Sequence, residues 1–288
     1  MQSLERVEAA ASLSRPRLWA QVAIIAVFYS VYSFTRNLFG SARLGDGEEP
    51  VDAFEHALRV IDIEQAMSLY RELDVQRWFL PGGTLRLGTW FIQFWNVFYG
   101  TAHFFVTIGA FIWIYVRGPG RFKYWRNVLG VTTAVGILGF ALFPLMPPRL
   151  LNDTESEFGG GRLAIEQGVD PDEIAFVDTL AEYGGPWAFN TGPVKALSNQ
   201  YAAMPSLHIA WAIWCTCVLW TLVNRRWVRV LLVLYPLATL FCIVVTANHY
   251  WLDGVGGVAA LGIGVLVAEQ VSRWNRRRRG QGLPEPIG

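Results

Sequence analysis

Six long apolar runs dominate the 288-residue sequence and restrict the folds that it can adopt. They cover residues 18–34, 89–116, 128–145, 205–222, 228–245 and 255–267. A helix that crosses the hydrocarbon core of a bilayer needs about 20 mostly apolar residues. With 53% hydrophobic residues and a mean hydropathy of +0.30, the chain is too apolar for an ordinary water-soluble domain. We therefore predict an all-α bundle of six transmembrane helices.

Basic residues gather at alternate ends of these runs, which predicts how the helices are oriented. Of the 24 Lys and Arg residues, 15 lie in four segments, at 6–17, 117–126, 225–229 and 273–279. All four segments fall on one side if the chain crosses the membrane six times. Because Lys and Arg concentrate on the cytoplasmic side, we expect a multi-pass protein of the cell membrane with both termini in the cytoplasm. The basic tail is expected to bind anionic lipid rather than nucleic acid.

The predicted topology divides the chain into three parts. Residues 1–17 form a cytoplasmic N-terminus without the features of a signal peptide. Residues 18–272 form a single membrane-embedded domain, whose extracytoplasmic segments are expected at about 41–87 and 147–202. Residues 273–288 form the basic cytoplasmic tail. The three cysteines fall inside predicted spans without the spacing of a metal site, and we interpret them as packing residues.

Both predicted extracytoplasmic segments have interpretable patterns. Within 51–79, apolar residues at helical spacing alternate with charges, which predicts an amphipathic helix in the membrane interface. His56 and Glu64 are expected on its solvated or interfacial face. The connection at 152–200 is long, and we expect it either to shape the choice of acceptor or to be partly disordered. In the last run, glycines interleaved with alanines predict close helix packing.

Two short polar motifs beside the apolar runs carry groups suited to phosphoryl transfer. Residues 203–208 read AMPSLH, and residues 246–253 read TANHYWLD. Because the chain crosses the membrane and returns between these motifs, His208 and His249 are expected at one outer face, together with Arg149. Asp253 follows His249 at i+4, where its carboxylate can hold one ring nitrogen protonated and leave the other free.

These positions suggest a role for each residue. An imidazole nitrogen can attack phosphorus, so His249 is the predicted nucleophile and Asp253 the group that orients it. Pro205 favours a helix start, which places His208 in the first turn of its helix, where a phosphate is stabilised. His208 is then the predicted general acid, with Ser206 as an additional hydroxyl donor.

The motifs resemble those of the lipid phosphate phosphatase (PAP2) superfamily, specifically the branch of fungal inositol phosphorylceramide synthase, sphingomyelin synthase and their bacterial relatives. The resemblance covers roughly residues 96–257 and is most specific in PSLH and ANHYxxD. It implies a six-helix membrane enzyme that attacks a lipid phosphate through a histidine, with no metal and no cofactor. Arg149, in MPPRL, resembles the arginine with which the family holds phosphate, and Asn248, in the second motif, is also expected to bind the substrate.

A further pattern, N-x-x-Y-x-x-x-H, is formed by Asn96, Tyr99 and His103 in the second apolar run. These residues are candidates for lining the same cavity, although a structural polar contact explains them equally well.

The chain departs from the pattern typical of the water-using members, KxxxxxxRP, PSGH and SRxxxxxHxxxD. The positions of the lysine, the proline, the glycine of PSGH and the second arginine hold Leu142, Leu150, Leu207 and Ile243. PSLH and ANHYxxD are more common in the synthase branch. We therefore predict a phosphotransferase that forms a phosphohistidine on a membrane lipid and transfers the phosphoryl group or phospho-headgroup to a small alcohol or lipid acceptor.

Of three alternative functions, two remain open and the sequence excludes the third. The same machinery could use water, as in phosphatases of lipid phosphates or polyprenyl diphosphates. A non-catalytic transporter or scaffold could keep the fold. CDP-alcohol phosphotransferases need an aspartate cluster for two metals, but Asp253-Gly254 is followed by Val255-Gly256-Gly257, with no other aspartate nearby. We reject this last class, and the oligomeric state stays open.

Overall fold

The computed structural model describes residues 50–80, 86–184 and 199–278, together with part of 17–30. Ten helical elements and no strand are present in these residues. The predicted span at 18–34 lies largely outside the described residues. The same holds for most of the N-terminus, the tail beyond 278 and the loop at 185–198.

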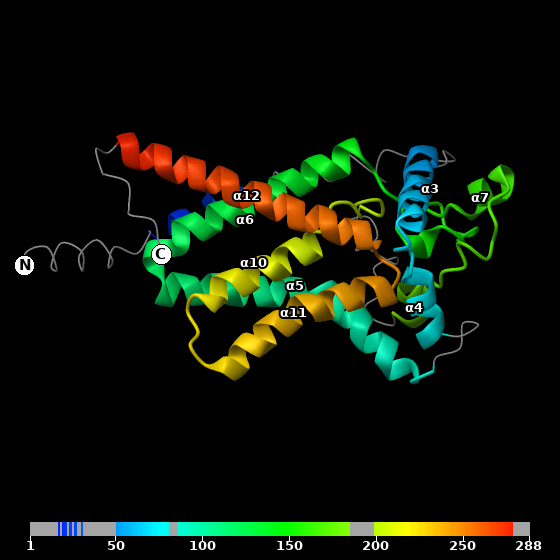
Figure 1. Ribbon diagram of the computed structural model, residues 1–288, viewed down its shortest axis with the longest axis horizontal. Coiled ribbons are helices and arrows are strands. Elements are labelled where there is room, and N and C mark those ends of the chain that lie inside the picture. Colours follow the sequence, from blue (N-terminus) through cyan, green and yellow to red (C-terminus); the bar gives the residue numbers. More distant parts are fainter. Residues whose placement is uncertain are drawn as a thin grey trace, which may run out of the picture.

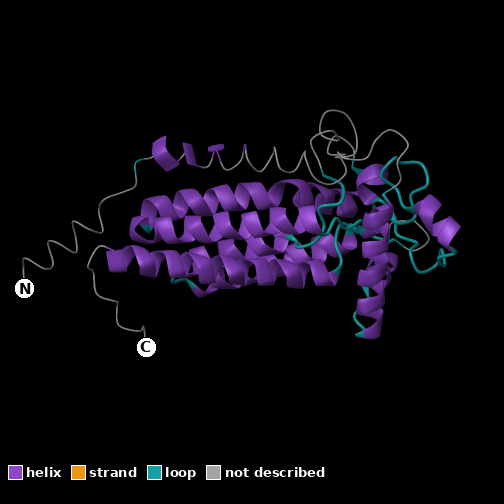
Figure 2. Ribbon diagram, turned by 90° about the horizontal axis from the view of Figure 1, so that it is seen from above, coloured by secondary structure: helices purple, strands orange, loops and turns teal. Residues whose placement is uncertain are grey.

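Five helices run alongside one another as an up-and-down bundle (Figures 1 and 2). They are α5 (Thr89–Arg117), α6 (Pro119–Leu142), α10 (Leu207–Trp220), α11 (Arg226–Val245) and α12 (Trp251–Arg278). By length and composition, α5, α6, α11 and α12 could each cross a membrane. The apolar helix α10 has 14 residues and is shorter than a typical span. The described residues therefore contain four of the six predicted spans in full length.

The two ends of the bundle differ in charge. The described basic segments 117–126, 225–229 and 273–278 lie at the α5–α6 junction, the α10–α11 junction and the C-terminal end of α12. All three are at the same end of the bundle in Figure 1. The motifs at 203–208 and 246–253 lie at the opposite end, as the apolar and basic patterns predict.

Elements outside the bundle cover the motif-bearing end. Helix α3 (Val51–Ala66) lies across this end of the bundle (Figure 1) and is followed by α4 (Glu72–Phe79). The segments η3 (Pro148–Leu150), α7 (Gly161–Gln167) and α8 (Thr179–Tyr183) complete the cover. One face of α3 is buried in a cluster that also contains Leu145, Met146 and Tyr250.

Two expectations for the segment 51–79 are corrected by this arrangement. The amphipathic pattern forms two helices rather than one. Glu64, which we expected on a solvated or interfacial face, is completely buried. His56 is half-buried, stacks on Phe143 and has Nδ1 2.8 Å from the Pro144 carbonyl oxygen.

Glycines bring the start of α10 against its two neighbours. A Cβ on Gly136 of α6 would stand 2.5 Å from Leu207 Cδ2 and 2.9 Å from its Cγ. A Cβ on Gly257 of α12 would overlap the Ser206 carbonyl oxygen and lie 3.4 Å from Ala210 N. Backbones approach this closely only where the side chain is absent. The small-residue pattern of the last run thus packs α12 against the PSLH segment.

Candidate functional site

The end of α11 and the start of α12 place His249 and Asp253 against each other. Ala247 adopts a left-handed backbone conformation with φ +52°, which ends α11 in a tight turn. Both Asn248 N and His249 N then donate to the Ile243 carbonyl oxygen. Helix α12 begins only at Trp251, so His249 precedes it and the i+4 spacing does not arise within one helix. Nevertheless, His249 Nδ1 lies 3.1 Å from Asp253 Oδ2.

The pair is deeply buried, and one ring nitrogen of His249 has no partner among the described residues. His249 is 2% exposed and Asp253 is not exposed. The same oxygen, Asp253 Oδ2, also accepts a hydrogen bond from Tyr250 N at 3.0 Å. His249 Nε2 has no hydrogen-bond partner among the described residues. Asp253 therefore keeps the proton on Nδ1, and the Nε2 lone pair is available to a ligand.

A second imidazole faces the first. The ring of His208, in the first turn of α10, has its centroid 5.5 Å from that of His249. It stacks on Tyr99 at 4.5 Å and meets the edge of His103 at 4.4 Å, both of which lie on α5. His208 Nε2, like His249 Nε2, finds no partner in the described part of the chain. Pro205 lies outside α10, whose N-cap is Ser206, so our placement of proline at the first helical position was wrong.

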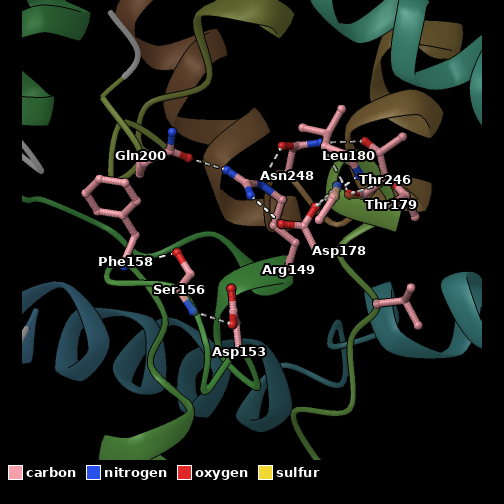
Figure 3. A network of polar contacts seen from close by, with 12 residues as sticks. Arg149, Asp153, Ser156, Phe158, Asp178, Thr179, Leu180, Gln200, Thr246 and Asn248 are labelled. Carbon is pink, nitrogen blue, oxygen red and sulfur yellow. Dashed lines mark hydrogen bonds and ion pairs between the residues drawn. The ribbon is translucent and has the colours of Figure 1, made fainter. Parts of the chain in front are cut away.

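Arg149 is held by three segments that are distant in sequence (Figure 3). Its Nε donates to Asn248 Oδ1 at 3.0 Å, and its Nη2 donates to Gln200 Oε1 at 2.6 Å. Its Nη1 forms a 2.7 Å ion pair with Asp178 Oδ2. These contacts use three of the five N–H donors of the guanidinium. Arg149 is therefore fixed in orientation, and these three contacts leave two of its N–H groups unused.

Asp178 binds Arg149 and also caps the N-terminus of α8. As the N-cap of α8, its Oδ1 accepts hydrogen bonds from Leu180 N and Ala181 N at 3.0 Å. Asn248 is likewise held, because its Nδ2 donates to Thr246 Oγ1 at 2.9 Å. The groups around Arg149 are thus fixed by local backbone structure as well as by the arginine.

A cavity of about 190 Å³ lies next to these groups. Arg149, Asn248, His208, His103 and Tyr99 contribute to its wall. The rest of the wall is formed by Gly100, Phe104, Pro147, Leu180, Asn199, Gln200, Ala202 and Ala203. His249 is not part of the wall, and its ring centroid lies 5.5 Å from that of His208, which is. The cavity thus combines a cation, two imidazoles and an apolar surface.

Of the other four residues with predicted site roles, two line the cavity and two do not. Ser206 is completely buried, and its Oγ has no partner among the described residues and does not cap α10. Tyr99 and His103 do line the cavity, with His103 Nδ1 3.0 Å from the Tyr99 carbonyl oxygen. Asn96 does not line it. Its amide exchanges hydrogen bonds of 2.7 and 2.9 Å with Thr179, which agrees with the structural alternative for this residue.

Sequence reasoning did not single out Asp178 and Gln200, although both hold Arg149. The long connection at 152–200 was expected to shape the site, but no periodicity marks the two residues within it. The one available signal was the sequence DTLAEY at 178–183, in which an aspartate precedes a short helix.

Comparison with known proteins gives one match. No similar chain was found among curated proteins or among solved structures. A family model described as the PAP2 superfamily matches residues 58–267. The matched range contains both motifs, Arg149 and every residue that lines the cavity. Since it spans well over half of the chain, the protein belongs to the PAP2 superfamily.

Proposed function

We propose that the protein is an integral-membrane phosphotransferase that works through a phosphohistidine on His249. Membership of the PAP2 superfamily suggests phosphatase or phosphotransferase activity on lipid phosphates. The observation that carries the finer proposal is the state of His249. This buried imidazole is oriented at Nδ1 by Asp253, has an unpartnered Nε2 and faces the ring of His208.

The proposed reaction has two steps at this site. His249 Nε2 forms a bond to phosphorus while the bond to the leaving oxygen breaks, and His208 gives its proton to that oxygen. Arg149 binds the nonbridging oxygens through the two N–H groups that its protein contacts leave over. In the second step, His208 takes the proton of an alcohol, whose oxygen displaces His249 from phosphorus. Both imidazoles then return to their starting state.

Transfer to an alcohol is favoured over hydrolysis by two departures in the sequence and by the cavity wall. In the sequence, Leu142 and Ile243 take the positions of two cations that water-using members carry, although neither lines the cavity, since Leu142 is 73% exposed and Ile243 is fully buried. Pro147, Leu180, Ala202 and Ala203 add apolar wall to the cavity. Such a lining suits an acceptor with apolar parts. These features support the synthase branch rather than the phosphatases.

The proposal is tested by incubating the purified protein with isotopically labelled phosphatidylinositol, phosphatidylethanolamine and phosphatidate, each with and without diacylglycerol, ceramide or inositol. Product masses distinguish a transferred headgroup from a hydrolysed one, because water labelled with ¹⁸O marks only the hydrolysed product. We expect the alcohol-dependent product to dominate. His249→Ala should abolish turnover, whereas Asn127→Ala, at the other end of the bundle, should not. Turnover retained in His249→Ala would refute the mechanism.

We further propose that the chain crosses the plasma membrane six times, with the site on the extracytoplasmic side. The position of three basic segments at the end remote from the site supports this orientation. Exposed apolar residues of α3 and the following turn, such as Ile63 and Met67, support an interfacial position for α3. Single cysteines placed at exposed positions 62 and 121 test the orientation, since only the former should react with a membrane-impermeant thiol reagent applied to intact cells.

A further inference from the structure

Two glutamates from outside the bundle bind the first turn of α12. Glu72 Oε1 accepts a hydrogen bond from Trp251 N at 2.8 Å, and Glu64 Oε1 accepts one from Leu252 N at 2.9 Å. An α-helix begins with N–H groups that have no partner inside the helix. Here, these groups bind side chains that lie 179 and 188 positions earlier in the chain. The extramembrane helices α3 and α4 therefore cap α12.

The contacts adjoin those of the proposed catalytic pair. Asp253 Oδ2 accepts from Tyr250 N, the N–H group just before the two that the glutamates bind. Three carboxyl groups thus bind the N–H groups of three successive residues, 250, 251 and 252. Since Asp253 also contacts His249 Nδ1, the direction in which α12 begins determines where the imidazole points.

The two glutamates form an unusual buried pair. Neither side chain is exposed, and in residues 50–80, 86–184 and 199–278 neither forms an ion pair with Lys or Arg. The titratable groups that face Glu64 are Glu72 of α4, Asp253 of α12, and Tyr70 and Tyr250. Glu64 Oε2 accepts no hydrogen bond from a described donor. Two adjacent carboxylates without a cation cannot both be ionised, so the pair shares a proton.

Burial and the neighbouring Glu72 determine where the proton lies. Burial, then the hydrogen bond and charge of Glu72, raise the pKa of Glu64 from 4.5 to about 9. Burial also raises the pKa of Glu72, but hydrogen bonds from Glu64, Trp251 and Arg71 favour its charged form. At neutral pH, the protonated Glu64 therefore donates to the Glu72 carboxylate. Above about pH 9, a second negative charge appears beside Glu72 and Asp253.

From these contacts, we propose that Glu64 and Glu72 are positioning residues, which hold the first turn of α12 and thereby fix His249 and Asp253 relative to His208. Neither glutamate takes part in the proposed steps, and both act through the backbone N–H groups of Trp251 and Leu252 that they bind. The inference rests on the proposed function of His249. It also predicts a pH dependence that a purely structural cap would not impose on the chemical step.

The first experiment compares four proteins in lipid nanodiscs, with the labelled lipid and acceptor that the wild type uses. In the wild type, kcat should fall above about pH 9 with the slope of one proton. Glu64→Gln keeps an acceptor for Leu252 N and a donor for Glu72, so it should retain most of the turnover at pH 7 and lose the alkaline fall. Glu64→Ala should lower kcat by about 10- to 100-fold with little change in KM, because a displacement near 1 Å has this effect. Asp62→Asn, on the exposed face of α3, should match the wild type.

A second measurement detects the protonation of Glu64 directly and requires no turnover. The infrared carbonyl band of a protonated carboxyl group should be present at pH 7, disappear near pH 9 in the wild type and be absent from Glu64→Gln. This infrared test does not use Glu64→Ala, so it still applies if that variant does not fold. The inference would be overturned if the band is missing, or if kcat of the wild type does not fall above about pH 9. It would also be overturned if kcat of Glu64→Gln still falls at alkaline pH, or if Glu64→Ala has a normal kcat. Turnover retained in His249→Ala would instead refute the proposed function and leave the infrared result standing.

Discussion

Replacing Gly257 of α12 by alanine tests the packing that supports the site. The added Cβ would overlap the carbonyl oxygen of Ser206 and lie 3.3 Å from the Ser206 carbonyl carbon and 3.4 Å from Ala210 N. All three are backbone atoms at the start of α10, so no flexible side chain can move aside. The strain can be relieved only by separating α12 from the segment that carries His208.

The size of this separation follows from ordinary contact distances. Nonbonded heavy atoms rest about 3.5 Å apart or more, so relief of the overlap requires a movement on the order of 1 Å. His208 belongs to α10 and His249 lies in the turn just before α12, with ring centroids 5.5 Å apart. A misplacement of this size costs about 100-fold in rate. Overpacking also destabilises a fold by about 1–3 kcal/mol.

The assay measures turnover of the labelled lipid and the thermal unfolding midpoint in detergent. Gly262→Ala is the matched control, because it lies on the same helix and its Cβ would meet no atom within 4 Å. We expect Gly257→Ala to lose about 100-fold in kcat and Gly262→Ala to match the wild type. If both variants turn over at the wild-type rate, the contact between α12 and Ser206 does not position the site, and the reasoning is refuted.

Four other outcomes are expected. Asp253→Asn removes the carboxylate that orients His249 and should lower kcat by about 10³- to 10⁴-fold in single-turnover kinetics; a loss below tenfold would contradict this role. Arg149→Lys keeps the charge but not the fork of N–H donors, so kcat/KM should fall about 100-fold, whereas Arg162→Lys on the exposed side of α7 should have no effect. Dialysis against EDTA should leave turnover unchanged, because the proposed steps use no metal; a loss restored by a divalent cation would revive the two-metal alternative. Finally, Glu64 is protonated in the folded protein and ionised in the unfolded one between pH 4.5 and about 9, so the unfolding midpoint should fall as pH rises through this window. Glu64→Gln should flatten that dependence, and an equally steep curve in this variant would count against the raised pKa.

Local patterns predicted much of the bundle. The apolar runs at 89–116, 128–145 and 228–245 overlap α5, α6 and α11, because a bilayer-spanning helix needs a continuous apolar surface that composition alone reveals. The run at 255–267 marks only the middle of α12, which starts at Trp251 and continues into the polar residues that follow. Helix ends depend on capping contacts made by other segments, and hydropathy does not report them.

The proximity of the candidate residues was predictable where they lie in short motifs. The helical hairpin between the motifs brings His208 and His249 together, and Asp253 contacts His249 as its position four residues later suggested. The partners of Arg149 and of the α12 N-terminus were not predictable in the same way. Asp178, Gln200 and Glu72 act through hydrogen bonds across 29 to 179 positions, and Glu64 follows a helical pattern in which a glutamate normally faces solvent.

The anchoring of Arg149 has a consequence for any attempt to change what the enzyme accepts. Its guanidinium is bound by Asn248, in the turn between α11 and α12, and by Asp178 and Gln200 of the long connection at 152–200. An exchange of that connection between homologous proteins would therefore also replace two of the three residues that hold the Arg149 side chain. Chimeras that keep an aspartate and a glutamine at these two places should preserve the chemistry while altering specificity, and those without them would lose both together.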